Sequence, residues 1–303
     1  MRSIFIVGIF YIGIVFGLLG EEPKETSARL KEIQDLISTL KYESGNISLP
    51  HDLAIIHLEE GFQYLNPDDT EKVLVKIWGN PAHGHKSLGM LVPKDFDPLS
   101  KSAWVVVVQY TEEGYVSEED AQKINYNDLL KQMKESVAEA SKQREKEGYS
   151  SLELIGWATP PRYDAKEHKL YWAKELRFGQ EKETTLNYNI RILGRKGVLE
   201  LNVVSGIQQL KEVEDAGPKI LSMVSFNPGS RYADFNSSTD KMATYGIAAL
   251  VAGGVAAKAG LFKGLWIGLL AFKKFIFVGV VAASTWIKKL FTKKRPPGLE
   301  NNE

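Results

Sequence analysis

The chain contains no cysteine among its 303 residues. This absence excludes disulfide bonds, thiolate nucleophiles, and zinc or iron–sulfur sites built on cysteine. Three common catalytic patterns are absent too: the Gly-x-Ser-x-Gly elbow, the phosphate-binding Gly-Lys-Ser/Thr loop and the His-Glu-x-x-His helix. With 44% hydrophobic and 25% charged residues, the composition is typical of a globular protein that packing holds together. We therefore expect no cofactor and no metal.

Acidic residues are missing from almost the whole C-terminal part of the chain. Lys241 to Leu299 holds ten Lys and Arg and no Asp or Glu, whereas Glu21 to Asp240 holds 27 basic and 36 acidic residues. An acidic body repels phosphate backbones, so we expect no nucleic acid as a partner. Basic residues that flank apolar segments suit the cytoplasmic surface of a membrane.

The two ends of the chain are strongly apolar. Residues 1–20 begin with one positive charge, Arg2, followed by an uncharged run, which is typical of a signal peptide or an uncleaved N-terminal anchor. Residues 242–290 predict membrane-embedded helices, either one span with an interfacial or re-entrant segment or a hairpin of two spans. With one span, the positive-inside rule makes 291–303 a basic cytoplasmic tail and puts the body outside.

Small residues recur at every fourth position of this apolar tail. They are Ala248, Ala252, Ala256, Gly260, Gly264 and Gly268. On a helix they would form one stripe that allows a second helix to approach closely, although Ala and Gly are common in membrane helices in any case. We predict that the stripe mediates helix packing, by self-association or with another membrane protein.

The remaining chain divides by its patterns into three parts. Residues 21–45 read as an amphipathic helix and linker, and 233–241 as a juxtamembrane linker. Residues 46–232 predict an α+β body with an antiparallel sheet and flanking helices. This body forms either one unit or two halves, 46–150 and 151–232.

Local signals place several elements in the first half of the body. Asn66 followed by proline and two aspartates predicts a helix start, and the β-branched run Ser102–Tyr110 predicts a central strand. Glu59–Gly61 is expected to join a pair of strands, and Ser117 with Asp120 to cap the next helix.

From Leu152 onward, apolar residues recur at every second position. Leu186, Tyr188, Ile190 and Ile192, for example, alternate with Asn187, Asn189 and Arg191. This period predicts antiparallel strands that are buried on one face.

His83 and His85, around Gly84, are the only close pair of histidines. Two imidazoles on a loop suit zinc or copper, but no nearby acidic residue or third histidine completes a site. We interpret this segment as a solvated loop.

The stretch GWATPPRYDAKEHKLYWAKEL, residues 156–176, concentrates aromatic and charged residues. One interpretation is a hairpin at the sheet edge, with cross-strand aromatic pairs and with Pro160 and Pro161 ending one strand. The other is a binding platform for a peptide or protein. Its candidate residues are Trp157, Arg162, Tyr163, Tyr171 and Trp172.

This stretch, with WGNP, LGMLVP, LNYNIRILGRKGVLELNVV and YADFNSSTDKMATYGIAALVAGGVAAKAG, resembles a family of bacterial membrane-anchored proteins known only as a domain of unknown function. The resemblance runs from about Ile47 to Leu290. It implies attachment to a bacterial membrane, and it supplies no activity, cofactor or catalytic residue. Together with the positive-inside rule, this predicts a protein of the inner membrane with its body on the periplasmic side.

Two functions from different classes fit these features. The first is a membrane-anchored extracytoplasmic scaffold or partner-binding protein of the bacterial envelope, whose partners are the lipid bilayer and membrane proteins. The alternative is an envelope hydrolase acting on peptide, lipid or glycan, which requires acidic residues and histidines to converge in a concave pocket. The residues available for such a pocket are His51, Asp52, His57, Asp164 and His168.

Overall fold

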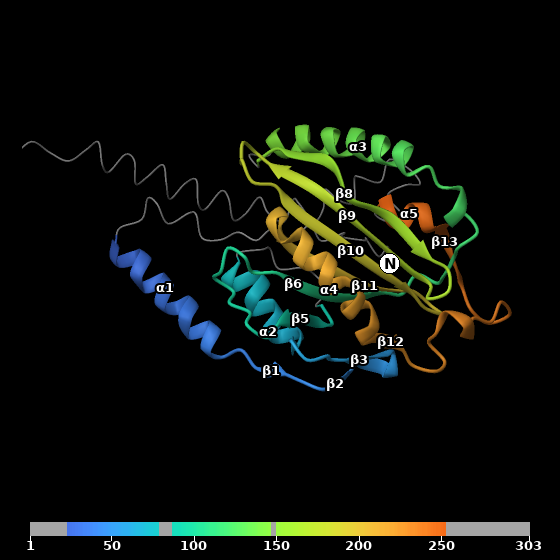
Figure 1. Cartoon of the computed structure of the whole chain (residues 1–303), viewed down its shortest axis with the longest axis horizontal. Coiled ribbons are helices and arrows are strands. Elements are labelled where there is room, and N and C mark those ends of the chain that lie inside the picture. Colours follow the sequence, from blue (N-terminus) through green and yellow to red (C-terminus); the bar gives the residue numbers. More distant parts are fainter. Residues whose placement is uncertain (1–22, 79–86, 147–149, 253–303) are drawn as a thin grey trace, which may run out of the picture.

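The computed structural model describes residues 23–78, 87–146 and 150–252, and its largest element is an eight-stranded antiparallel sheet (Figure 1). In spatial order the strands are β1 (Tyr42–Glu43), β4 (Phe62–Leu65), β5 (Gly89–Pro93), β6 (Val105–Thr111), β11 (Val198–Gly206), β10 (Thr185–Leu193), β9 (Lys169–Phe178) and β8 (Leu152–Asp164). Helices flank this sheet, so the predicted α+β class is confirmed. The β-branched run forms β6, fourth in the order, which confirms it as a central strand.

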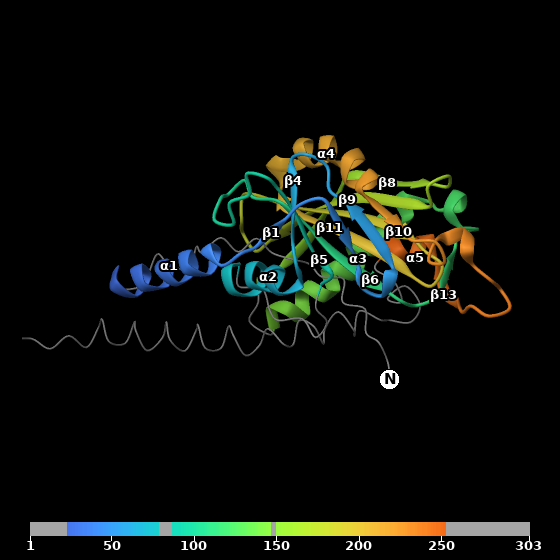
Figure 2. The same ribbon diagram turned by 90° about the horizontal axis from the view of Figure 1, so that it is seen from below.

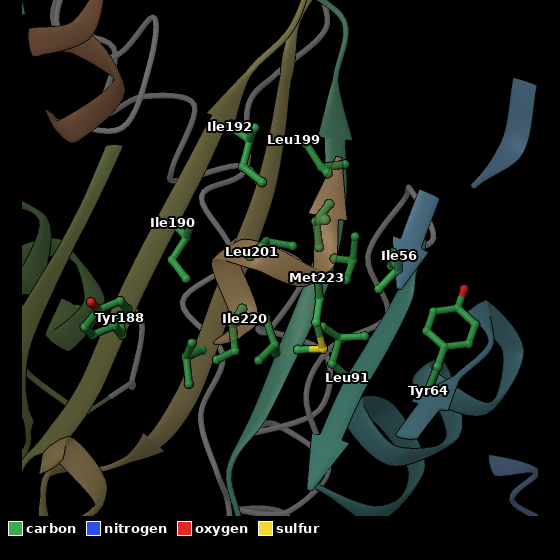
Figure 3. Packing of buried hydrophobic residues seen from close by; sticks show 14 of the residues in the cluster. Ile56, Tyr64, Leu91, Tyr188, Ile190, Ile192, Leu199, Leu201, Ile220 and Met223 are labelled. Carbon is green, nitrogen blue, oxygen red and sulfur yellow. The ribbon is translucent and has the colours of Figure 1, made fainter. Parts of the chain in front are cut away.

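Helices cover both faces of the sheet, as Figure 2 shows. On one face lies α4 (Leu210–Met223), preceded by the 3₁₀ turn η5 (Ile207–Gln209). Figure 3 shows Ile220 and Met223 of α4 against Ile190 and Leu201 of the sheet. The other face carries α1 (Pro23–Ser38), α2 (Pro67–Glu71), α3 (Tyr126–Lys146) and α5 (Ile247–Ala252).

The helix at Asn66 begins as the sequence predicts. The Asn66 side chain accepts a hydrogen bond of 3.0 Å from the backbone N–H of Asp69, and Pro67 occupies the first turn of α2. The helix then continues as a π-helical turn, Lys72–Ile77, whose apolar residues pack against β5 and β6.

The segment Glu59–Gly61 does not close a hairpin, so this prediction is wrong. The strand before it, β3 (Ala54–His57), belongs to a separate three-stranded sheet with β2 (Asn46–Ser48) and β12 (Val224–Phe226), while β4 joins the large sheet. Apolar residues of β3 and β12 enter the core that α4 covers, and this burial outweighs pairing with the next strand in sequence.

Asp120 does not cap α3, which corrects a second prediction. Asn125 does so instead, because its side-chain oxygen accepts hydrogen bonds from the N–H groups of Asn127 and Asp128, at 3.0 and 3.3 Å. Between Asp120 and Asn125 lies the 3₁₀ turn η4 (Ala121–Lys123).

The alternating strands are buried on both faces, not on one. Ile190 on one side of β10 and Asn187, Asn189 and Arg191 on the other are all at most 3% exposed. The alternation correctly separates apolar from polar side chains. However, helices also cover the polar side, so these polar groups lie inside the protein.

The first residues of the predicted membrane tail belong to the body, so the body extends past residue 242, where the tail was predicted to begin. β13 (Met242–Gly246) pairs in parallel with β7 (Tyr115–Ser117), and α5 buries Ile247 and Val251 against the cluster under α3. In the described ranges no helix combines the length and the apolarity that crossing a membrane requires. Residues 253–290 of the predicted tail and residues 1–20 lie outside those ranges.

The predicted linker 233–241 is fastened to the sheet. It begins within the η6 turn (Tyr232–Asp234), and Asp240 receives two hydrogen bonds from the guanidinium of Arg195, at 2.7 and 3.0 Å. A carboxylate and a guanidinium in this two-bond geometry hold each other's orientation, so the chain reaches β13 along a fixed path.

Candidate functional site

The stretch GWATPPRYDAKEHKLYWAKEL forms most of the β8–β9 hairpin at the edge of the large sheet, as one interpretation predicts. The prediction that Pro160 and Pro161 end a strand is wrong, because β8 continues to Asp164. The ladder shifts its register between Thr159 and Arg162. This bulge leaves both prolines out of the regular pairing, where their missing N–H groups cost nothing.

The five residues predicted as a binding platform are divided between the two faces of the sheet. Trp157, Tyr163 and Trp172 pack in the cluster under α3 and α5, whereas Tyr171 packs toward α4. Arg162 is exposed, with its guanidinium carbon 5.9 Å from the centroid of the Tyr171 ring. The structure therefore brings only Arg162 and Tyr171 together on an accessible face.

The two tryptophans attach helix α3 to the hairpin. Trp172 is 1% exposed, so it is not part of any surface. Trp157 is half-buried, and its indole N–H donates a hydrogen bond of 3.3 Å to the backbone oxygen of Tyr126, the first residue of α3. Both residues hold the fold together in this arrangement.

Glu118, directly after β7, collects the polar groups at the tip of the hairpin. Its Oε2 accepts a hydrogen bond from the hydroxyl of Tyr163 and lies 3.1 Å from Nδ1 of His168. Burial, and next the hydrogen bond to Glu118, raise the pKa of Tyr163 above its ordinary value. The phenol therefore stays protonated and donates to the carboxylate.

Stacked aromatic rings lie beside Glu118. The centroid of the Tyr232 ring lies 4.3 Å from the ring centroids of both His168 and Tyr115. Tyr115 also stacks on Phe235, with 3.9 Å between the two ring centroids. The Tyr232 hydroxyl donates to the backbone oxygen of Val116 at 2.7 Å. This group joins β7, the hairpin tip and the segment before β13 into one unit.

A buried network around Arg191 was not predicted. Its guanidinium donates to the side-chain oxygens of Asn202 and Asn189, at 2.9 and 3.3 Å, and its Nη2 lies 3.0 Å from Oε2 of Glu200. The sequence signal for this network is the alternation of apolar and polar residues in β10. That alternation predicts a polar side that faces solvent, because sequence does not show which helices cover a sheet.

The residues that a hydrolase would require have separate partners. Asp52 accepts a hydrogen bond of 2.6 Å from Asn227, whereas His168 contacts Glu118. Within the part of the chain that the structure describes, no hydrogen bond or ion pair joins any two of His51, Asp52, His57, Asp164 and His168.

Two sequence predictions fall partly or wholly outside the described ranges. His83 and His85 lie outside them, and among the described residues no group of three or more His, Asp or Glu could hold a metal ion. Of the small-residue stripe, Ala248 and Ala252 lie half-buried on α5. Its other members, Ala256, Gly260, Gly264 and Gly268, lie beyond the described residues.

Comparisons with known proteins complete this description. The search of curated proteins found no match. Among solved structures, the chain is similar to the solution structure of cyanobacterial PsbP (CyanoP) from Synechocystis sp. PCC 6803. The identity is 12% and the TM-score 0.33, over 62% of this chain and 92% of that one. A family described as a protein of unknown function (DUF2167) matches residues 41–284. The match spans most of the sequence, so the chain belongs to the DUF2167 family.

Proposed function

We propose that this protein is a membrane-anchored scaffold of the bacterial envelope, which holds an extracytoplasmic body in a fixed orientation for partner proteins. The observation that carries the proposal is the junction between body and tail. The segment that leads into the apolar tail is part of the folded body, because it contributes a strand and a helix to it.

Three contacts support a rigid junction. Asp120 accepts hydrogen bonds from the N–H groups of Ile247 and Ala248 at the start of α5. Arg195 binds Asp240 before β13, and β13 pairs with β7. A helix that is fixed to the body at its first turn keeps a defined orientation relative to the body, whereas a flexible linker does not.

The composition of the tail supports the membrane anchor and the orientation. After the described residues the chain is apolar, and its last lysines and Arg295 follow that apolar segment. Positive residues at this end favour the cytoplasmic side, which leaves the acidic body on the periplasmic side. The small-residue stripe then supplies a face for a second helix in the bilayer.

Affinity purification from native membranes in mild detergent tests this function. We expect the full-length chain to retain partners, or itself, that a chain ending after Ala252 loses. Ending the chain at Asp240 would be a poor comparison, because it removes β13 and α5 from the body. A matched full-length variant, Gly264→Leu with Gly268→Leu, should dissociate the assembly while the body stays folded. If the full-length chain, the shortened chain and the glycine variant all retained the same partners and the same complex size, the proposal would be contradicted.

Cysteine labelling tests the orientation, because the chain has no cysteine of its own. The exposed Asp95 of the body and Gly298 of the tail serve as single introduction sites. In intact spheroplasts, an impermeant maleimide should label Asp95→Cys and spare Gly298→Cys until the membrane is opened. Labelling of Gly298→Cys in intact spheroplasts would contradict a single span.

A further inference from the structure

The covered face of the sheet beside α3 carries three rows of side chains that cross the strands. In the first row Lys174 lies between Trp157 and Asn187, and in the second Asn189 lies opposite Trp172. Because directly opposed residues share a face, the third row places Arg191 beside Glu200 on this same side. The rows therefore gather two cations, several amides and one indole N–H.

Arg191 is fully engaged within this face. It is 3% exposed, it pairs with Glu200, and it donates to Asn202, Asn189 and the backbone oxygen of Ile190. Glu200 in turn accepts a hydrogen bond of 2.8 Å from Thr111. The charge of Arg191 is thus compensated by Glu200, as a buried charge requires.

Lys174 and Trp172 lack such compensation. Among the described residues, no hydrogen bond or ion pair reaches the Lys174 ammonium, and the buried indole nitrogen of Trp172 has no acceptor. The guanidinium carbon of Arg191 lies 5.3 Å from the centre of the Trp172 ring. One positive charge and one buried donor on adjacent rows are therefore left without a negative or accepting partner.

An unpaired buried donor destabilises a fold, and an unpaired buried charge does so more strongly, so such groups mark sites where a partner is missing. An anion with acceptor oxygens would be a partner for both groups. We propose that Lys174 and the indole N–H of Trp172 bind a small oxyanion, a carboxylate or phosphate group, beneath α3. Lys174 is half-buried, so the ligand enters on its side.

The titration of Lys174 agrees with this geometry. Burial, and next the charge of Arg191, lower the pKa of Lys174 to about 8. The ammonium is still charged at neutral pH, and no carboxylate of the described chain offsets these costs. A bound oxyanion would offset both, and its two oxygens would accept from the ammonium and the indole.

Binding to the full-length protein in mild detergent tests the site, with four probes measured by calorimetry in phosphate-free buffer. Inorganic phosphate and acetate represent free anions. Dihexanoyl phosphatidylglycerol represents a lipid headgroup, and dihexanoyl phosphatidylcholine serves as its zwitterionic control. Lys174→Gln removes the charge at similar length, and Lys166→Gln, at an exposed lysine of the hairpin tip, is the matched control.

We expect saturable binding of at least one anion by the wild type. Affinity should fall by about tenfold or more in Lys174→Gln and stay within about twofold in Lys166→Gln. Trp172→Phe removes the indole N–H together with part of the ring, so its folded state is first checked by circular dichroism, and the folded variant should bind the anion more weakly. If phosphatidylglycerol binds more tightly than phosphate, the bound oxyanion is a lipid headgroup. If phosphate binds more tightly, it is a free anion. No saturable binding of any anion, or equal affinities in wild type, Lys174→Gln and Trp172→Phe, would overturn the proposal.

Discussion

The carboxylate of Asp120 accepts hydrogen bonds from the backbone N–H groups of Ile247 and Ala248, at 2.9 and 3.0 Å, across 127 and 128 residues of chain. A helix start leaves its first N–H groups without partners, and here a residue from another part of the body supplies both acceptors. This side chain is one of the contacts that join the body to the beginning of the tail.

Removing the Asp120 carboxylate should therefore loosen this junction. We expect Asp120→Ala to lower the free energy of unfolding of the full-length protein by about 1–3 kcal/mol, because two partly buried donors lose their acceptor. Denaturant unfolding in mild detergent measures the change. The neighbouring exposed Glu119, changed to alanine, should have little effect. Equal losses for both variants would show that Asp120 does not hold α5.

Gly114 should tolerate alanine much less than Gly61 does. Both have a positive φ, +111° and +99°, so alanine costs about 1 kcal/mol at either position. At Gly114 a Cβ would also lie 2.5 Å from the backbone oxygen of Lys241, whereas at Gly61 nothing lies within 4 Å. We expect a further loss of about 1–3 kcal/mol for Gly114→Ala alone, measured by denaturant unfolding. Similar stabilities would contradict the close contact before β13.

The Arg195–Asp240 pair predicts sensitivity to acid. The hydrogen bonds from Arg195, and next the N–H of Asn236, lower the pKa of Asp240 to about 2 from an ordinary 3.8. A lowered pKa stabilises the fold above about 3.8, and this contribution is lost as the pH falls toward 2. The melting temperature of the wild type should fall more across this window than that of Asp240→Asn. Asp95→Asn, at an exposed position, should behave like the wild type.

Lys174 predicts a pH dependence of the same sign in the alkaline range. Its pKa of about 8 lies below the ordinary 10.5, so between these values the unfolded chain binds more protons than the folded one. Stability contributed by this group therefore rises with pH from about 8 to 10.5. In phosphate-free buffer, the wild type should gain melting temperature relative to Lys174→Met across this window. A constant difference would show that Lys174 is not desolvated in the folded protein.

Features set by neighbouring residues could be predicted from the sequence. The β-branched run became β6, Asn66 with Pro67 started α2, and the period of two gave the antiparallel strands. In each case the deciding interaction lies within a few residues, as in a helix cap, or in the preference of β-branched side chains for a pleated sheet.

Features set by distant segments could not be predicted in this way. Asp120 resembles a helix cap in sequence, and it is one, but of a helix more than a hundred residues away. The polar side of β10 is buried because α3 and α5 cover part of that face, which alternation alone does not reveal. Met242–Ala252 is apolar whether it lies in a membrane or in a protein core, so its composition could not place it in the body.

The bulge at Pro160 and Pro161 has a consequence for how copies of this protein meet. β8 is a 13-residue strand at the open edge of a sheet, and a long free edge invites another chain to pair with it and to aggregate. Two consecutive prolines offer no N–H donors to an incoming chain, and the irregular register bends the edge away from the flat form that pairing needs. The hairpin therefore opposes edge-to-edge pairing between copies of this protein.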